Sequence, residues 1–266
     1  MTASETTTEW TDDLTACAEL VERGDPERFR AVMAAPVPAR AVLFPLYAFN
    51  IEVSRAPWVT QEPMIAEMRL QWWRDALEEI GQGSGIRRHE VVTPLALHLD
   101  ATGAHLLDRL IVARIWDVWK DPFEDEAAFR DYLDATSGHL LRAGAGMLRA
   151  DLPEAQARQA GFVLGLANWF RAVPALEGSG RQPLVDGREG HVAELAQEAL
   201  AALKDLRAAR GQVDRAAAPL MFGLPMAEAV LKLVVRTPAR VKDGALEVAP
   251  FAQKLGLLKA GAFGRW

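Results

Sequence analysis

The chain has 266 residues, of which 50% are hydrophobic and 25% are charged, a composition typical of a protein with a sizeable folded core. Its formal net charge of −6 argues against nucleic acid as the main partner, because neutralising phosphates requires a basic surface. The only cysteine, Cys17, excludes an intrachain disulfide and a thiolate-rich metal site.

The N-terminal segment is polar, and we expect residues 1–13 to be flexible. It has neither a basic start nor an apolar stretch, so it does not match a secretory signal. No apolar run in the sequence reaches the roughly 20 residues of a transmembrane helix. These patterns predict a cytoplasmic protein without a transmembrane segment.

Helical periodicity recurs along most of the chain, and Gly, Pro and acidic clusters separate the periodic segments. The broadest apolar stripe lies between Pro63 and Gly81 and carries Trp72. We see neither a fixed-period repeat nor a run of alternating strands. The expected helices are 14–21, 28–35, 47–54, 64–80, 104–119, 126–148, 154–173, 192–210 and 227–235.

This pattern predicts an all-α protein with a single domain over residues 1–266, because no loop is long enough to separate two domains. Residues 236–266 form a basic C-terminal segment. From Ala229 to Trp266 the chain carries seven Lys or Arg residues and two acids. Two interpretations stay open: a solvated terminus, which we favour, and a contact with an acidic partner or an anionic membrane surface.

The polar residues carry no recognisable metal-binding or catalytic motif. The five histidines show no ligand spacing, so a zinc site is not expected. The sequence has neither a glycine-rich phosphate loop nor a nucleophile elbow. Two acid pairs have i,i+4 spacing, Asp121 with Asp125 and Asp75 with Glu79. We interpret the first as capping of a helix start and the second as an exposed helix face, in preference to metal binding.

Six stretches, covering about residues 17–185, resemble the squalene/phytoene synthase family in matching order. The most specific of them is "RLQWWRDALEEI" at Arg69–Ile80. The others are "YAFNIEV" at Tyr47–Val53, "TPLALHL" at Thr93–Leu99, "FRDYLDATSGHLLRAGAGML" at Phe129–Leu148, "GLANWFRAVP" at Gly165–Pro174 and "GRQPLV" at Gly180–Val185. The resemblance implies the isoprenoid synthase fold, a helical bundle around a central cavity. Active members join two prenyl diphosphates, and Mg²⁺ ions on two aspartate-rich helices take up the charge of the departing pyrophosphate.

The first aspartate motif of that family is missing here. Counting from Tyr47, its acids would fall on Ser54, Arg55 and Trp58, and Pro57 stands among them. Arg55 would place a fixed cation where a metal ion should bind.

The second motif is incomplete as well. Asn168 and Arg171 are retained, but Ala172 and then Ala175 or Leu176 stand where the acids belong. The usual magnesium cage cannot form from these residues. We therefore assign no metal ligand, no catalytic residue and no cofactor.

These departures resemble the non-catalytic branch of the family, which includes a mitochondrial complex I assembly factor. That resemblance implies a pseudoenzyme that binds a hydrophobic ligand or, with a protein partner, assembles a respiratory membrane complex, with peripheral membrane contact left open. The alternative is an active prenyl-diphosphate synthase, a transferase of isoprenoid biosynthesis, that uses Mg²⁺ at an atypical site. The remaining readings are a purely structural role or an unrelated enzyme activity in the old cavity.

The surviving cavity is expected to bind an isoprenoid diphosphate or a lipid, with arginines at the anionic head group and an apolar body. The segments 47–54, 64–80, 129–148 and 154–173 are expected to surround it. The opposing interpretation is that the arginines pair with core acids such as Glu52 and Asp134. The expected ligand-binding residues are Tyr47, Phe49, Asn50, Arg69, Trp72, Asn168, Arg171 and Arg181.

Overall fold

The computed structural model describes residues 10–60, 62–249, 257, 258, 260–262, 264 and 266. These residues form helices and no strand, which confirms the all-α prediction for the described part of the chain. The α-helices are α1 (Asp12–Gly24), α2 (Pro26–Met33), α3 (Val37–Arg55), α4 (Pro63–Gln82), α5 (Val92–Ala96), α6 (Ala101–Arg114), α7 (Glu126–Leu133), α8 (His139–Met147), α9 (Glu154–Gly178), α10 (Glu189–Ala208) and α11 (Leu224–Arg236). Shorter helical turns that matter below are η1 (Ala56–Trp58), η2 (Ile115–Asp117), η3 (Asp134–Gly138) and η5 (Arg215–Met221).

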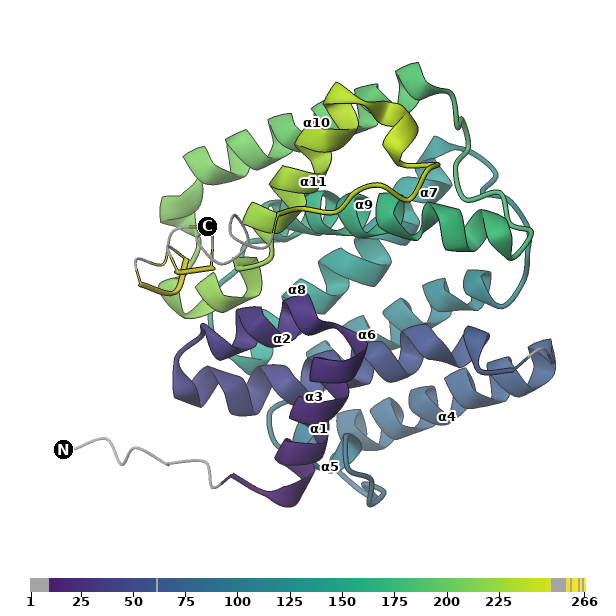
Figure 1. The fold of residues 1–266 in the computed structure, drawn as a ribbon. Coiled ribbons are helices and arrows are strands. Elements are labelled where there is room, and N and C mark those ends of the chain that lie inside the picture. The colour runs from purple at the N-terminus through teal and green to yellow at the C-terminus, as the bar shows by residue number, and fades with distance from the viewer. Residues whose placement is uncertain (1–9, 61, 250–256, 259, 263, 265) are drawn as a thin grey trace.

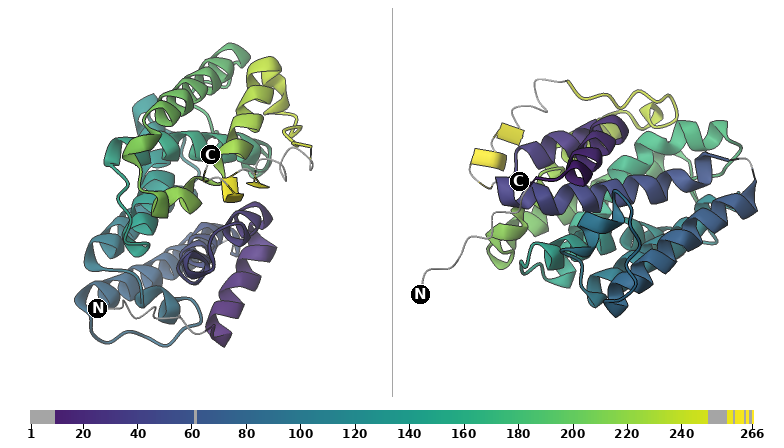
Figure 2. Two further views of the ribbon diagram at one scale, coloured as in Figure 1. Left: turned by 90° about the vertical axis from the view of Figure 1, so that its left-hand side faces the viewer. Right: turned by 90° about the horizontal axis from the view of Figure 1, so that it is seen from below.

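The helices divide into two groups joined by α8 (Figure 1). α3, α4 and α6 lie in the lower half of that view, and α9, α10 and α11 lie in the upper half. α8 and the preceding turn η3 contact helices of both groups, including α6 and α9. The left view of Figure 2 shows the same division from the side. The cavity described below lies between the two groups.

α3 is the central helix of the N-terminal group. Every residue from Ala41 to Ile51 is buried, as expected for a helix that is apolar on nearly all sides. A buried hydrophobic core continues from α1 through α3, α6, α9 and α10 to α11. The rigid position of α3 fixes the directions of its few polar side chains, among them Asn50 and Ser54.

The first two helices, α1 and α2, begin with side-chain caps. Thr11 accepts a hydrogen bond from the Leu14 N–H at 3.3 Å, so Asp12 and Asp13 belong to α1 rather than to a flexible tail. Residues 1–9 of the segment expected to be flexible lie outside the described residues.

The segment expected as one helix over 126–148 is α7, η3 and α8 in succession, with a π-helical turn at η3. Asp125 accepts a hydrogen bond from the Ala128 N–H at 2.8 Å, which confirms the capping interpretation of this acid. α9 passes very close to η3. A Cβ atom on Gly161 would lie 2.7 Å from the backbone of Gly138, so only glycine permits this approach.

The described end of the C-terminal segment packs on α10. Trp266 is buried, and its carbonyl oxygen accepts hydrogen bonds from Arg207, at 3.2 Å, and Arg210. The favoured interpretation of a solvated terminus is therefore wrong for this residue, while residues 250–256, 259, 263 and 265 lie outside the described part. Among the described helices, no single one is long and apolar enough to cross a membrane. η5 and α11 taken together, with a bend of 40° between them, reach the required length and apolar composition, and only by those two measures.

Candidate functional site

The cavity between the two helix groups has two compartments that share four lining residues, Asp25, Arg28, Ser137 and Asn168. The first, here the α3–α9 compartment, has a volume of about 430 Å³ and lies between the C-terminal end of α3 and the middle of α9. The second, here the apolar compartment, has a volume of about 180 Å³ and lies between α2, α8, α9 and α11.

The α3–α9 compartment brings together the positions at which the aspartate motifs are missing. Ser54, Arg55 and Trp58 line it from α3 and η1, and Asn168 and Ala172 line it from α9. Ser54 is already engaged within its own helix, since its hydroxyl donates to the Ile51 carbonyl at 3.1 Å. The two motif positions therefore face the same space without presenting carboxylates to it.

A buried network closes one side of this compartment. Asp117, only 2% exposed, accepts hydrogen bonds from Arg114 Nη1 at 2.9 Å and from the Tyr132 hydroxyl at 3.0 Å. Burial raises the pKa of Tyr132 well above its usual value. Burial alone would lower the pKa of Arg114, but Tyr132 and Asp117 together raise it, so the guanidinium stays charged. The carboxylate of Asp117 is thus committed to an internal ion pair.

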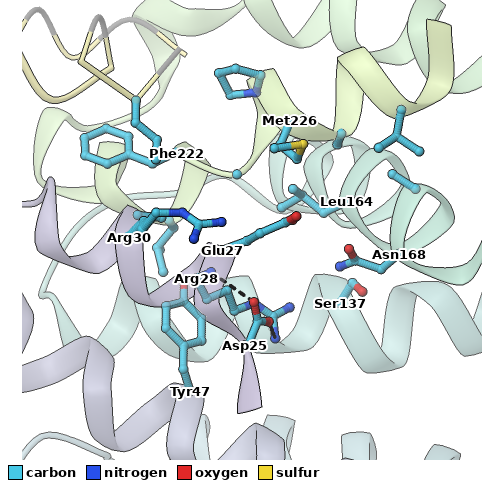
Figure 3. Close-up of a pocket in the computed structure, with 18 of the residues that line it drawn as sticks. Asp25, Glu27, Arg28, Arg30, Tyr47, Ser137, Leu164, Asn168, Phe222 and Met226 are labelled. Atoms are coloured by element: carbon cyan, nitrogen blue, oxygen red, sulfur yellow. Dashed lines mark hydrogen bonds and ion pairs between the residues drawn. The ribbon is translucent and has the colours of Figure 1, made fainter. Parts of the chain in front are cut away.

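Charged residues from α2 and α9 meet at the mouth of the cavity, and Figure 3 shows those on the α2 side, Asp25, Glu27, Arg28 and Arg30. Arg171 donates two hydrogen bonds to Glu27, of 2.8 and 2.9 Å. Asp25 caps α2 through the Arg28 N–H at 3.0 Å and also pairs with the Arg28 guanidinium at 3.5 Å. That guanidinium lies 5.1 Å from the ring centroid of Tyr47. Burial raises the pKa of Tyr47, so its hydroxyl is protonated at neutral pH.

The apolar compartment extends inward from this mouth. Arg30 also lines its entrance, and the inner walls come from α8, α9, η5 and α11. Figure 3 shows Leu164, Phe222 and Met226 around this space. The apolar lining residues are Ala31, Leu140, Leu141, Leu164, Ala167, Pro219, Leu220, Phe222, Pro225, Met226, Ala227, Ala229, Val230, Val248 and Leu257. A charged mouth above an apolar body suits an amphiphilic ligand.

The donor set of the cavity does not fit a magnesium cluster. Mg²⁺ takes oxygen ligands in octahedral geometry, and a cluster that binds diphosphate needs several free carboxylates. The acids that line the α3–α9 compartment, Asp25 and Asp117, are each tied to an arginine. Within the described residues no group of three or more His, Cys, Asp or Glu is arranged to hold a metal ion.

Four of the expected ligand-binding residues line the cavity. Tyr47, Asn168 and Arg171 line the apolar compartment, and Asn50 lines the α3–α9 compartment. Asn50 is buried, and its side-chain oxygen has no hydrogen-bond partner among the described residues. It is the one expected residue that directs an unsatisfied acceptor into this region.

Three others lie elsewhere, because α4 packs against α6 and not around the cavity as expected. Arg69 is exposed on α4. Trp72 lies beneath the Arg87 guanidinium, 4.8 Å from it. Phe49 is fully buried and packs edge-on against Trp73, with ring centroids 5.4 Å apart. Motif order placed α3, η3 with α8, and α9 at the cavity, but α4 lies away from it, and the order did not show which face of α3 meets the cavity.

Arg181 lines neither compartment and packs against the edge of the α3–α9 compartment. It is buried and donates hydrogen bonds to the carbonyl oxygens of Trp119, at 2.7 Å, and Asp117. Its guanidinium also lies 5.1 Å from the ring centroid of Trp58, which itself lines the compartment. These contacts occupy Arg181 with the loop after α6.

Arg171 pairs with Glu27, and not with Glu52 or Asp134, the acids expected as arginine partners. Asp134 pairs with Arg158 at 3.6 Å. Asp25 and Arg28 also line the cavity, although the sequence did not predict either of them there. The run "DPER" at residues 25–28 signals a capped helix start with Pro at its first position. That signal predicts α2 but not its place at the mouth.

Comparison with curated proteins finds complex I assembly factors. The "NADH dehydrogenase (ubiquinone) complex I, assembly factor 6 homolog" of Drosophila melanogaster is 30% identical over 177 residues, which cover 62% of this chain and 51% of that protein. The human assembly factor 6 is 27% identical over 131 residues, covering 47% of this chain and 38% of that protein. The chain thus spans about half or less of the length of these relatives.

Comparison with solved structures finds the same fold. A dehydrosqualene synthase superposes with a TM-score of 0.78 at 13% identity, covering 94% of this chain and 96% of that chain. The squalene synthase HpnC from Alicyclobacillus acidocaldarius gives a TM-score of 0.70 at 18% identity, covering 84% and 93%. The fold is therefore that of the isoprenoid synthases. The family model described as "Squalene/phytoene synthase" matches residues 21–185, more than half of the chain, and the protein belongs to that family.

Proposed function

We propose that this protein is a non-catalytic member of the squalene/phytoene synthase family, in which the cavity binds a lipid or isoprenoid diphosphate. The observation that carries the proposal is the α3–α9 compartment, where Ser54 and Ala172 stand at the two motif positions and the nearby acids are paired with arginines. The single-domain reading over residues 1–266 is part of the same proposal.

The chemistry explains why such a site does not turn over prenyl diphosphates. Ionising an allylic diphosphate leaves pyrophosphate, whose charge metal ions normally stabilise by several kcal/mol. Each ~1.4 kcal/mol is tenfold in rate, so losing the metal cage slows the reaction by orders of magnitude. Arg28 and Arg171 offer binding charge at the mouth, but both already face acids and neither replaces a metal cluster.

The names of the curated relatives support a second part of the proposal, a role in assembling a respiratory membrane complex together with a protein partner. In this reading the bound amphiphile either stabilises the folded protein or makes its state depend on which lipids are present. In this proposal the protein is a peripheral membrane component on the cytoplasmic side.

Two measurements test the proposal. Purified protein with Mg²⁺ and farnesyl or geranylgeranyl diphosphate is expected to release no pyrophosphate above background; robust Mg²⁺-dependent release would favour the alternative, an active synthase with an atypical site. Calorimetry with a non-hydrolysable farnesyl diphosphate analogue in EDTA is expected to show micromolar binding. The absence of both heat and a thermal shift would leave a scaffold without a ligand.

A further inference from the structure

A groove separate from the cavity runs between α6 with η2 on one side and α7 with η3 on the other. Its volume is about 850 Å³ and it is open to solvent. Of its described lining residues only Tyr132 also lines the cavity. Nothing in the proposed ligand-binding role uses this groove.

The floor of the groove is aromatic. The rings of Trp116 and Phe123 are stacked, with centroids 4.1 Å apart and planes within 6° of parallel. Tyr132 packs against Phe123 with centroids 5.4 Å apart. At the rim, Trp119 is 47% exposed and Val112 is 45% exposed. Large aromatic residues at an open surface are the type that dominates binding energy at protein interfaces.

The apolar surface continues from the groove onto α4. Ile115 lines both the groove and a neighbouring hollow formed by Met64 and Met68, which are 73% and 66% exposed. The Trp119 indole N–H donates to Glu67 at 2.9 Å, which ties the rim of the groove to α4. Flexible methionines beside tryptophan form an adaptable apolar surface, as in proteins that bind amphipathic helices.

The charges around the groove are predominantly acidic. Its lining includes four acids, Asp121, Glu124, Asp131 and Asp134, and two arginines, Arg109 and Arg158. Arg158 is engaged with Asp134. Asp121, Glu124 and Asp131 are exposed and make no ion pair within the described residues. Arg109 is likewise exposed without an ion pair among the described residues, so the three acids leave the rim with a net excess of negative charge beside an apolar floor.

We propose that this groove is a docking site for a basic amphipathic helix of a partner protein. The acidic rim complements Lys and Arg on the polar face of such a helix, and the aromatic floor accepts apolar side chains at i, i+3, i+4 and i+7. An added β-strand has no sheet edge to pair with in the described part of the chain. An anionic membrane or a nucleic acid would be repelled by the same acids.

The test uses a fluorescein-labelled peptide of about 14 residues, four helical turns, with leucines on one face and lysines on the other. Binding to the 266-residue chain is followed by anisotropy at about 50 mM and about 300 mM salt. The Leu/Lys peptide is expected to bind at least about tenfold more tightly than a matched Leu/Glu peptide, and the difference shrinks at the higher salt.

Two groove variants and two control variants locate the binding. Trp119→Ala and Glu124→Lys/Asp131→Lys are each expected to weaken the Leu/Lys peptide about tenfold or more. Glu22→Lys/Glu194→Lys, a matched charge change at exposed positions on α1 and α10, is expected to leave it unchanged. Arg171→Ala, at the mouth of the cavity, is also expected to bind the peptide normally, so failure of the ligand-binding proposal is separable from failure of this one. Thermal melting confirms that each variant is folded.

Peptide binding that survives both groove variants, or equal binding of the acidic and basic peptides, overturns the proposal. Sedimentation of the protein alone supplies a further check. Self-association that Trp119→Ala abolishes would assign the groove to a second copy of this chain. Binding to anionic vesicles that depends on Trp119 would assign it to a membrane surface.

Discussion

Arg171 of α9 and Glu27 of α2 are joined by two hydrogen bonds, of 2.8 and 2.9 Å, across the mouth of the cavity. They are 144 residues apart in the chain. The pair connects α2 to α9, both labelled in Figure 1, at the place where a ligand would enter. A ligand phosphate that takes Arg171 must displace a carboxylate from it.

This competition predicts opposite effects for the two partners. Glu27→Gln is expected to tighten binding of a farnesyl diphosphate analogue several-fold, because the guanidinium is released to the phosphate. Arg171→Ala is expected to weaken it about tenfold, the loss of one charge-assisted contact. Calorimetry in EDTA measures both. If both variants bind like the unchanged protein, Arg171 has no part in ligand binding.

The same pair contributes little to stability. Both side chains are partly exposed, at 39% and 28%, and such pairs contribute about 0–1 kcal/mol. Urea unfolding of Arg171→Ala is therefore expected to stay within about 1 kcal/mol of the unchanged protein. A larger loss would mean that the pair holds the two helix groups together.

Asp117 is expected to be far more important for folding. Asp117→Asn removes the counter-charge of Arg114 in a buried setting and is expected to lower the free energy of unfolding by about 3 kcal/mol. Tyr132→Phe removes only a hydroxyl from the same network, with an expected loss of about 1–2 kcal/mol. Urea unfolding ranks the two variants. Equal losses would show that the hydroxyl, and not the ion pair, organises this wall.

Much of the fold was readable from the sequence because helical periodicity and capping act locally. Asp125 before an apolar repeat predicted the start of α7, and Tyr47–Ser54 fell within α3. The assignment of Arg69 and Trp72 to the cavity failed for a non-local reason. The apolar stripe of α4 is wide enough to pack on several neighbours, and only the tertiary structure shows that it meets α6.

The candidate site was harder to predict than the fold. The missing carboxylates were visible at Ser54 and Ala172, because their positions follow from motif spacing. The partner of Arg171 was not, since a surface ion pair between distant helices leaves no periodic signal. The sequence contains many acids that could pair with Arg171. Only the fold, which brings the start of α2 to α9, shows that the partner is Glu27.

Because α9 contacts η3 closely, we expect the cost of replacing a glycine by alanine to depend strongly on which glycine is replaced. Gly161→Ala would place a Cβ atom 2.7 Å from the Cα and N atoms of Gly138, and backbone cannot rotate away as a side chain can. We expect a loss of about 2–3 kcal/mol in the free energy of unfolding. The matched control is Gly146→Ala in α8, where no atom lies within 4 Å, with an expected gain of up to about 1 kcal/mol. A neutral Gly161→Ala would show that the helices separate at little cost.

Acid sensitivity is expected from His139, which is 2% exposed. Burial lowers the pKa of its imidazole below 6.5; Asp134 opposes this and Arg109, Arg142 and Arg158 reinforce it. The unfolded chain then binds the proton at higher pH than the folded chain, so stability is complete above pH 6.5 and falls as the pH drops through the lowered pKa. Unfolding free energies between pH 6.5 and about 5 should show this slope. The slope should be shallower in His139→Gln and unchanged in the exposed control His105→Gln; an identical slope in all three would assign the effect to other groups.

Restoring acids at the motif positions is expected not to restore a synthase. In Ser54→Asp/Ala172→Asp one carboxylate would face the α3–α9 compartment from each helix, but a diphosphate-binding cluster needs several, and Arg55 and Arg114 supply positive charge to the same space. The new acids are therefore expected to pair with arginine before they bind Mg²⁺. Thermal melting with and without Mg²⁺ should show no metal-dependent shift, and pyrophosphate release from farnesyl diphosphate should stay at background. The matched control Ser54→Asn/Ala172→Asn changes shape without charge. Magnesium-dependent turnover in the aspartate variant alone would mean that this compartment lacks only its carboxylates, and that Arg55 and Arg114 do not oppose the chemistry.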